Sequence, residues 1–509
     1  MIDFKGRAKT VLESDRTSSG ILTAMIIAVV MVVNALLYTL VQTFGWQITY
    51  IDEYDYSLSG ATDELFASAI EQNKKVKISF CMAEDEVKVH STGAEVYITA
   101  KNLAERYEGF IELDFINITT KQDQHGNLVS LSKYQTDMEG NKTKILKSSV
   151  IFSCGEGDRE VYRVVTDSAT SAGFATFFNL DSSMYAISYN GEEIFAAMIS
   201  WVTAETHKKA YFTQYHGETA DSSFATLLAC AGYYVDVVDL RQNAVPEDAD
   251  LLIVSNPKND FEAARPGVNV ITEIDRLEAY LERGGNLLVT LDPYVKTLPI
   301  LEGILSKYGI AFSTTTTPAG ASVRNMVKES TNAITTDGFT FVAEYGNNEL
   351  GDMVSGSIKS GGSVVVREVS ALELSGDAKP LLVSSPSSNL EANGSVVSDG
   401  GSYVIAAYAS KDYGNGQTAR VLVIPSIYIA VSDALVANGY SNKDFFYATF
   451  EHFYGAEGMP YGCKPVIYSS STLENLTMGM ARLYTAITLA IPLAIAAVGT
   501  VVIVRRRNR

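Results

Sequence analysis

The chain has 509 residues, of which 47% are hydrophobic and 19% charged, with 40 basic and 59 acidic side chains. This length allows about three domains with sizeable cores, and the apolar content excludes a disordered chain. The net charge of −19 argues against nucleic-acid binding. The histidines and the four cysteines are dispersed and form no HExxH or CxxC motif, so they favour neither a metal cofactor nor a disulfide scaffold.

Two uncharged, apolar stretches predict transmembrane helices at 20–45 and 482–504. About 20 apolar residues span a bilayer, and membrane helices tolerate a proline such as Pro492. The alternative for the first stretch is a cleaved signal peptide, which would be shorter and followed by small residues. The alternative for the second is a buried soluble helix.

Basic residues flank both stretches on the side of the chain ends. Lys5, Arg7, Lys9 and Arg16 precede the first, and the sequence RRRNR follows the second. Because positively charged flanks stay inside, we expect 1–19 and 505–509 to be cytoplasmic. The protein is then a plasma-membrane protein with a large, acidic extracytoplasmic part.

The first extracytoplasmic part, 46–203, alternates helices and strands in a pattern that predicts a thioredoxin-like domain. Apolar residues at helical or strand spacing mark a helix, a strand, a helix and a strand, at 61–73, 76–82, 94–107 and 110–118. Ser59 or Thr62 is the expected cap of the first helix. Cys81 has no partner at CxxC spacing, so we interpret it as a structural thiol.

The second part, 204–460, predicts a doubly wound α/β sheet of the flavodoxin-like or amidotransferase-like type. Strands and helices follow one another with short links, and one strand is wholly apolar, as in a sheet covered on both faces. The predicted elements are a strand, a helix, two strands, a helix and a strand, at 208–215, 221–233, 233–240, 249–257, 271–285 and 286–293. A β-rich insert at about 310–418 precedes a buried strand at 419–426 and a helix at 442–455, and 461–481 is a linker.

Four polar residues follow predicted strands of this sheet: His216, Glu218, Asn256 and Asp292. Ligands of open α/β sheets bind beyond the carboxyl ends of the strands, so we predict a ligand-binding crevice there. These side chains supply hydrogen-bond donors and acceptors for a polar ligand such as a sugar or peptide fragment. The alternatives are that they cap helices and loops, or that they are catalytic.

Motifs of several enzyme classes are missing from the sequence. GNGQTA at 414–419 precedes a strand, and its Asn-Gly pair indicates a hairpin turn instead of a dinucleotide site. The chain has no phosphate-binding GxxxxGK[ST] and no GxSxG elbow, and Cys230 lies in the middle of a helix. We therefore predict that the protein is not an enzyme.

The order of several loose motifs resembles the GldG-like auxiliary proteins of ABC-type transport systems, a bacterial family first known from gliding motility. These motifs are YSLSGAT, YFTQYHGE, VPEDADLLIVSNPKNDF, YLERGGNLLVTLDP and SNKDFFYATFEHFYG. One departure is Tyr215, where the family often has glycine. The resemblance implies a non-catalytic auxiliary subunit that works with a separate ATPase and a multi-spanning permease. It also implies an amidotransferase-like fold that lacks the Cys-His-Glu apparatus.

Two alternatives of other classes stay open. One is an extracytoplasmic amidotransferase-like hydrolase that uses His216 and Glu218. The other is a structural or adhesive surface protein built on the Ser/Thr-rich insert. Besides the transporter subunits and the bilayer, we expect a polar small molecule or a cell-envelope ligand as partner.

Overall fold

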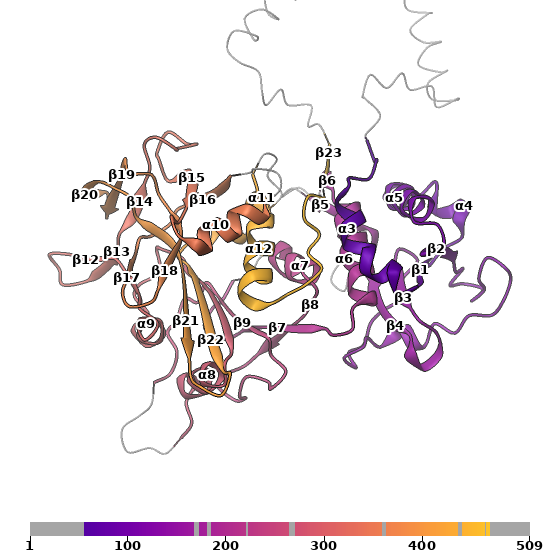
Figure 1. The fold of residues 1–509 in the computed structure, drawn as a ribbon, viewed down its shortest axis with the longest axis horizontal. Helices are drawn as coiled ribbons and strands as arrows, with labels where there is room; N and C mark the ends of the chain where they lie inside the picture. Colours follow the sequence, from indigo (N-terminus) through magenta and orange to yellow (C-terminus); the bar gives the residue numbers. More distant parts are fainter. Residues whose placement is uncertain are drawn as a thin grey trace, which may run out of the picture. The chain divides into compact units, whose positions relative to one another are not determined.

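The computed structural model describes residues 55–166, 173–180, 185–219, 222–263, 270–358, 363–435, 440–463 and 465–468 (Figure 1). Apart from Asp55, these residues belong to one compact unit that begins at Tyr56. The predicted transmembrane segments at 20–45 and 482–504 and the predicted cytoplasmic ends lie outside the described residues. Within the described ranges, the structure contains no helix that is both long and apolar enough to span a bilayer.

The amino-terminal part is built on a four-stranded sheet. In sheet order its strands are β2 (Ile111–Phe115), β1 (Val76–Phe80), β3 (Val150–Cys154) and β4 (Val161–Val165). β1 and β2 are parallel, and β3 is antiparallel to β1 and β4. The helices of this part are α3 (Ala61–Glu71), α4 (Glu84–Val87), α5 (Gly93–Arg106) and α6 (Gly191–Thr203). The β-α-β unit that the sequence predicts is therefore present.

The predicted cap of α3 is wrong. The helix follows Gly60 and has no side-chain cap. The Thr62 hydroxyl is buried and lies 2.7 Å from the Tyr107 hydroxyl, while the Ser59 hydroxyl donates to Glu192 at 2.8 Å. The Ser59 hydroxyl also accepts the backbone N–H of Ala61 at 3.3 Å, but Tyr107 and Glu192 are far away in the sequence, and local sequence carries no sign of these two partners.

A small antiparallel sheet joins the last described residues to the amino-terminal part. Its order is β23 (Val466–Ile467), β6 (Ala186–Tyr189) and β5 (Phe178–Leu180). β23 comes from the last described residues and pairs with β6, which precedes α6. The carboxyl-terminal end of the described chain is thereby held against the amino-terminal part.

The second part contains five adjacent parallel strands. In sheet order they are β8 (Tyr233–Val238), β7 (Lys208–Thr213), β9 (Leu251–Ser255), β10 (Asn286–Thr290) and β22 (Thr418–Ile424). In chain order this is the arrangement 2-1-3-4-5, which is one of the two common orders of doubly wound sheets. All five residues of β9 are buried, as its apolar sequence predicts.

Helices cover both faces of this sheet. They are α7 (Ser222–Cys230), α8 (Glu273–Glu282), α9 (Pro299–Ser306) and α12 (Asn442–Tyr454). Leu251 and Ile253 of β9 pack in one core with residues of α7 and α12. Leu252 and Val254 pack in a second core with residues of α8 and α9. Alternate residues of one strand thus serve the two faces, which confirms the predicted mixed α/β class.

The β-rich insert continues the same sheet. β21 (Val404–Asp412) pairs antiparallel with β22, and beyond it lie β18 (Lys379–Val383), β15 (Thr340–Tyr345) and β16 (Val364–Arg367). With β11 (Ile310–Phe312) and β17 (Leu372–Leu374), the sheet has 11 strands. β21 and β22 are joined at Asn415 and Gly416, both with positive φ, so GNGQTA forms the predicted hairpin turn.

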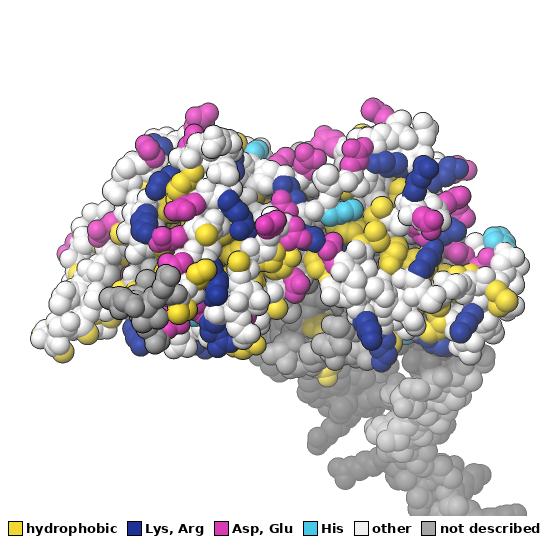
Figure 2. Space-filling model, turned by 90° about the horizontal axis from the view of Figure 1, so that it is seen from below, with side chains coloured by type: hydrophobic (Ala, Val, Ile, Leu, Met, Phe, Trp, Pro, Cys, Tyr) yellow, Lys and Arg dark blue, Asp and Glu magenta, His cyan; other side chains and the backbone are white. Residues whose placement is uncertain are grey.

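The remaining elements of this part are short. Two small sheets lie outside the large one: β12 (Thr314–Thr316) with β13 (Ser322–Arg324), and β14 (Met326–Lys328) with β19 (Ser388–Ala392) and β20 (Ser395–Gly401). The short helices are α10 (Glu349–Ser357) and α11 (Ser432–Leu435). On the face shown in Figure 2, acidic and basic side chains are interspersed.

Candidate ligand-binding site

The parallel sheet reverses its winding direction at β7. β8 pairs with one edge of β7 and β9 with the other. Loops that leave two such strands go to opposite faces of the sheet, and the crevice between them is where doubly wound folds bind ligands. Of the predicted site residues, His216 and Glu218 follow β7, and Asn256 follows β9. These three residues therefore flank the point of reversal.

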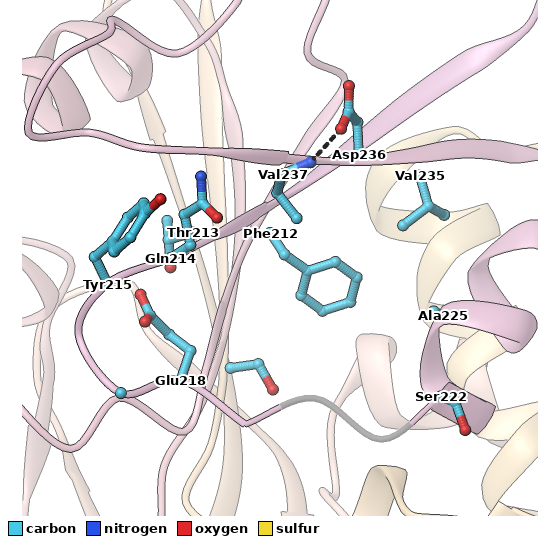
Figure 3. Close-up of a pocket in the computed structure, with 12 residues that line it drawn as sticks. Phe212, Thr213, Gln214, Tyr215, Glu218, Ser222, Ala225, Val235, Asp236 and Val237 are labelled. Atoms are coloured by element: carbon cyan, nitrogen blue, oxygen red, sulfur yellow. Dashed lines mark hydrogen bonds between the residues drawn. The ribbon is translucent and has the colours of Figure 1, made fainter. Parts of the chain in front are cut away.

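A pocket of about 530 Å³ lies at this edge (Figure 3). Its walls come from β7 and the loop after it, from β8, from α7 and from the end of β9. The lining includes the apolar side chains of Phe212 and Val235 and the polar side chains of Gln214, Glu218, Ser222 and Asp236. Phe212 and Val235 thus supply apolar surface, and Gln214 and Ser222 supply polar groups, which suits a polar ligand. The carboxylate of Glu218 is held by His216, and Asp236 lies on the opposite face of β8 from Val235.

The loop after β7 has an unusual backbone. Tyr215 has a φ of 80° and Gly217 a φ of 74°. The carbonyl oxygen of His216 accepts hydrogen bonds from the backbone N–H groups of Lys258 (2.8 Å) and Asn259 (2.9 Å). The Tyr215 ring is exposed and lies under the Arg241 guanidinium, 3.8 Å from it. Because positive φ favours glycine, the tyrosine at position 215 holds a backbone conformation that a β-carbon strains.

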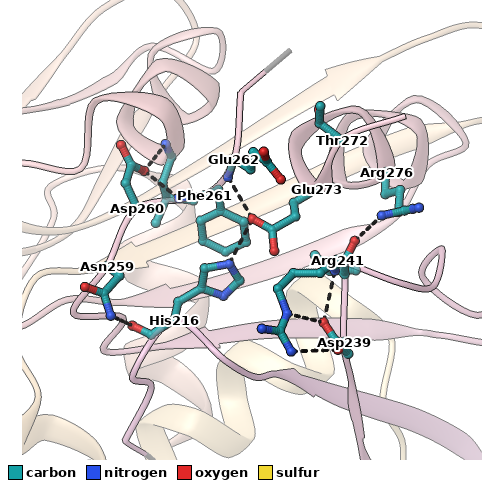
Figure 4. Close-up of polar contacts among 12 residues, drawn as sticks. His216, Asp239, Arg241, Asn259, Asp260, Phe261, Glu262, Thr272, Glu273 and Arg276 are labelled. Carbon is teal, nitrogen blue, oxygen red and sulfur yellow. Dashed lines mark hydrogen bonds and ion pairs between the residues drawn. The ribbon is translucent and has the colours of Figure 1, made fainter. Parts of the chain in front are cut away.

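His216 is fixed between two carboxylates. Its Nδ1 lies 2.8 Å from Glu218 Oε1, and its Nε2 lies 3.1 Å from Glu273 Oε2. The ring is 4% exposed and stacks on Phe261 with 4.0 Å between ring centroids. Figure 4 shows the imidazole beside Phe261, with Glu273 reaching it from the first turn of α8. Both ring nitrogens are therefore engaged within the fold.

The two neighbours of His216 favour its charged form. Burial acts to lower the pKa of His216, but the hydrogen bonds and charges of Glu218 and Glu273 outweigh it and raise that pKa above its ordinary value. Burial likewise acts to raise the pKa of Glu218, but the hydrogen bond from His216 lowers it. Only a protonated imidazole can donate from both nitrogens, so this arrangement of His216 between Glu218 and Glu273 favours the imidazolium form.

Asn256 follows β9 and contacts the loop after β7. Its φ is 52°, and its side-chain amide donates to the carbonyl oxygen of Thr219 at 3.1 Å. Its Oδ1 is buried and accepts no hydrogen bond within the described structure. Asn256 is thus connected to the His216–Glu218 loop through Thr219.

Asp292 occupies a turn of its own after β10. Its Oδ1 accepts a hydrogen bond from the backbone N–H of Tyr294 at 2.9 Å, and its carbonyl oxygen accepts one from the guanidinium of Arg324 at 3.3 Å. This is the turn-capping role that the sequence leaves open as an alternative. The contacts of Asp292 do not join it to His216.

Sequence reasoning missed Glu273, Gln214 and Asp236. Glu273 follows Thr272, which forms a capping box with Asp275, so in sequence it is one more acidic residue of a helix start. Its Oε1 is buried and has no hydrogen-bond partner in the described structure, which sets it apart from a solvated first-turn acid. Gln214 precedes the YHGE motif directly, and the alternation of β8 points to Asp236 as a polar residue on one of its faces.

The cysteines are not placed as nucleophiles or metal ligands. Burial raises the pKa of Cys230 and of Cys81 to about 12, so both thiols stay protonated at neutral pH. Cys230 belongs to the predicted helix α7, but it is the last residue of that helix and does not lie in its middle. Within the described ranges, no group of three His, Cys, Asp or Glu side chains is arranged to hold a metal ion.

No protein-family model and no curated protein matches the chain. Several solved structures are similar over 48% of it. The mmIFT52 N-terminal domain is 16% identical, with 96% of that chain covered and a TM-score of 0.35. A ThuA-like protein from Bacteroides uniformis is 16% identical (91% covered, TM-score 0.29), and PurLQS from Thermotoga maritima is 14% identical (99% covered, TM-score 0.28). These similarities concern the fold and carry no argument about function.

Proposed function

We propose that the protein is a non-catalytic, membrane-anchored auxiliary subunit of an ABC transporter, whose extracytoplasmic α/β part binds a polar ligand or partner. The observation that carries the binding function is the pocket at the reversal point of the sheet, with Gln214, Glu218 and Asp236 in its lining. The resemblance to GldG-like auxiliary proteins supplies the transport assignment. The two predicted transmembrane helices, a thioredoxin-like first domain and an amidotransferase-like second domain belong to the same proposal.

Binding is favoured over catalysis by the state of the groups that a hydrolase would use. Both nitrogens of His216 are hydrogen-bonded to carboxylates, and the Oε2 of Glu218 accepts the backbone N–H of His216 at 2.6 Å. A general base needs a free nitrogen or oxygen within reach of the substrate. His216 and Glu218 instead support the loop that forms one wall of the pocket.

The transport assignment is tested by affinity purification of the tagged, full-length protein from its native membrane in a mild detergent. We expect an ATPase and a multi-spanning permease to co-purify in amounts comparable to the tagged chain, as identified by mass spectrometry. Recovery of the tagged chain without either subunit contradicts the assignment.

The binding role is tested by separating pocket variants from scaffold variants. We expect Gln214→Ala to leave the melting temperature unchanged and to impair the transport-linked phenotype, because the Gln214 side chain makes no hydrogen bond within the described ranges. His216→Ala and Asp292→Ala should lower the melting temperature, because they remove supports of loops. Gln124→Ala, an exposed glutamine of the first part, is the matched control. A Gln214→Ala variant with full function contradicts the pocket as the binding site.

A further inference from the structure

The two ends of the described chain meet at one place. The ring of Tyr56, the first residue of the compact unit, lies 5.7 Å from that of Tyr189 on β6. Tyr468, the last described residue, donates its backbone N–H to the carbonyl oxygen of Ile187 at 3.0 Å. Its ring stacks on Phe178 of β5 at 6.3 Å, and Phe178 in turn contacts Tyr189. Both ends therefore leave the fold from the β23-β6-β5 sheet.

This sheet exposes apolar side chains at the same place. Tyr185 is 72% exposed, Ile187 38% and Ile467 39%. The register pairs Ile467 with Ser188, the neighbour of Ile187, so the two isoleucines project from opposite faces of the sheet. Tyr185, Ile187 and Ile467 are called the sheet-end patch below. It is an apolar tip and not a single flat face.

The lengths of chain beyond the two ends are short. Residues 46–55 separate the fold from the first predicted transmembrane segment, and 469–481 separate it from the second. At roughly 3.5 Å per extended residue, the first connection spans at most about 35 Å and the second at most about 45 Å. If both predicted segments cross the bilayer, the two short connections hold the β23-β6-β5 sheet close to the bilayer surface.

We propose that the sheet-end patch contacts the bilayer at the boundary between headgroups and acyl chains. This inference rests on the membrane anchoring of the proposed function. Tyrosine is enriched at that boundary because its ring is apolar and its hydroxyl remains hydrated, and the isoleucines bury apolar surface there. Since the chain has a net charge of −19, the contact is made by apolar burial and not by attraction to anionic lipid. It would hold the α/β pocket in a fixed orientation to the membrane.

The test uses the full-length protein reconstituted alone into phosphatidylcholine vesicles. An environment-sensitive fluorophore is attached to Ile187→Cys or Ile467→Cys, in a background where the half-buried Cys154 is replaced by serine. The matched control is Val396→Cys on β20, which is 51% exposed and lies in a different sheet. Lipids brominated in the upper acyl chain should quench the labels at 187 and 467 at least threefold more strongly than the label at 396.

Equal quenching at all three positions in vesicles that carry the protein overturns the inference. A second outcome also overturns the inference: the labels are not quenched in vesicles, and their spectra shift only when co-purified transporter subunits are added. That outcome favours a protein contact. Flotation of the vesicles measures anchoring separately. Protein that does not float contradicts the proposed anchoring, whereas protein that floats without quenching contradicts only the contact. If Ile187→Cys does not fold, Ile467→Cys at the end of its strand gives the same readout.

Discussion

Glu329 is a buried carboxylate that is held by hydrogen bonds and not by a cation. It is 2% exposed and accepts six of them, from the backbone N–H groups of Ser330, Thr331 and Ser385 and from the hydroxyls of Ser385, Ser387 and Ser388. Burial acts to raise the pKa of Glu329, but these hydrogen bonds outweigh it and lower the pKa to about 2. The serine-rich segment 384–388 is therefore folded around one charge.

We predict that Glu329→Gln destabilises the protein by about 3 kcal/mol. The NH2 group of glutamine is a hydrogen-bond donor, and it would face N–H and O–H groups that also donate. The folded pKa is below the ordinary value of 4.5, so the contribution of the carboxylate is complete above pH 4.5 and is lost as the pH falls towards 2. Thermal unfolding in detergent at a series of pH values measures both effects. Glu344→Gln, an exposed carboxylate on β15, should change stability by less than about 0.5 kcal/mol. Equal effects of the two substitutions would contradict the prediction.

The positive φ of Tyr215 predicts that glycine at this position gives a more stable protein than alanine, which reverses their usual order of stability. At ordinary positions glycine is less stable than alanine by about 0.5–1 kcal/mol, but at a φ of 80° it avoids the strain of a β-carbon. Both Tyr215→Gly and Tyr215→Ala lose the contact with Arg241, so that loss cancels in the comparison. We expect Tyr215→Gly to be more stable than Tyr215→Ala by about 1 kcal/mol in chemical denaturation. The reverse order would show that the loop adopts another backbone.

At the scale of elements, α6 and α12 are joined by a buried ion pair. Lys443 Nζ lies 2.8 Å from Glu193 Oε2, and the Tyr447 hydroxyl donates to Glu193 Oε1 at 2.6 Å. The Glu193 side chain is 8% exposed and that of Lys443 18%. One continuous core runs from Phe66 of α3 to Phe450 of α12 around this pair. The two parts that the sequence separates at residue 203 therefore pack on each other.

Removing one partner of this pair should cost more than removing both. We predict that Lys443→Met lowers stability by about 3 kcal/mol, because it leaves the Glu193 carboxylate buried without a cation. The double variant Glu193→Gln, Lys443→Met should be more stable than Lys443→Met alone. Lys147→Met removes an exposed pair with Glu86 and serves as the control, with an expected change below about 0.5 kcal/mol. Strict additivity in the double-mutant cycle would contradict the coupling.

The helices and strands of the α/β part were predictable because their signals are local. The apolar run of β9, the spacing of Phe445 and Phe450 in α12 and the glycine at the end of α8 each lie within one element. The contact of His216 with Glu218 was accessible from sequence because only Gly217 separates them. Its contact with Glu273 was not, since Glu273 comes from a later helix and resembles a capping acid in sequence. The extension of the sheet by β21, β18, β15 and β16 was equally hidden, because the sequence of a short strand does not specify which strands it pairs with.

At the scale of the whole molecule, the predicted topology can be tested from the exposed surface. Ser395, at the start of β20, is exposed. We predict that Ser395→Cys, in a background where serine replaces the half-buried Cys154, reacts with a membrane-impermeant maleimide on intact cells. Ser18→Cys, in the predicted cytoplasmic end, should react only after lysis. Labelling of Ser395→Cys only after lysis would contradict the topology.

The position of β22 in the sheet has a consequence for how the chain is made. This strand lies between β10 and β21, yet it is encoded more than a hundred residues after β10. Until residues 418–424 have been synthesised, β10 has an open edge with unpaired backbone groups. The apolar side chains beside that edge are then uncovered. Folding of this part therefore has to wait until most of the polypeptide is complete, and a ribosome that stops within the insert releases an aggregation-prone fragment.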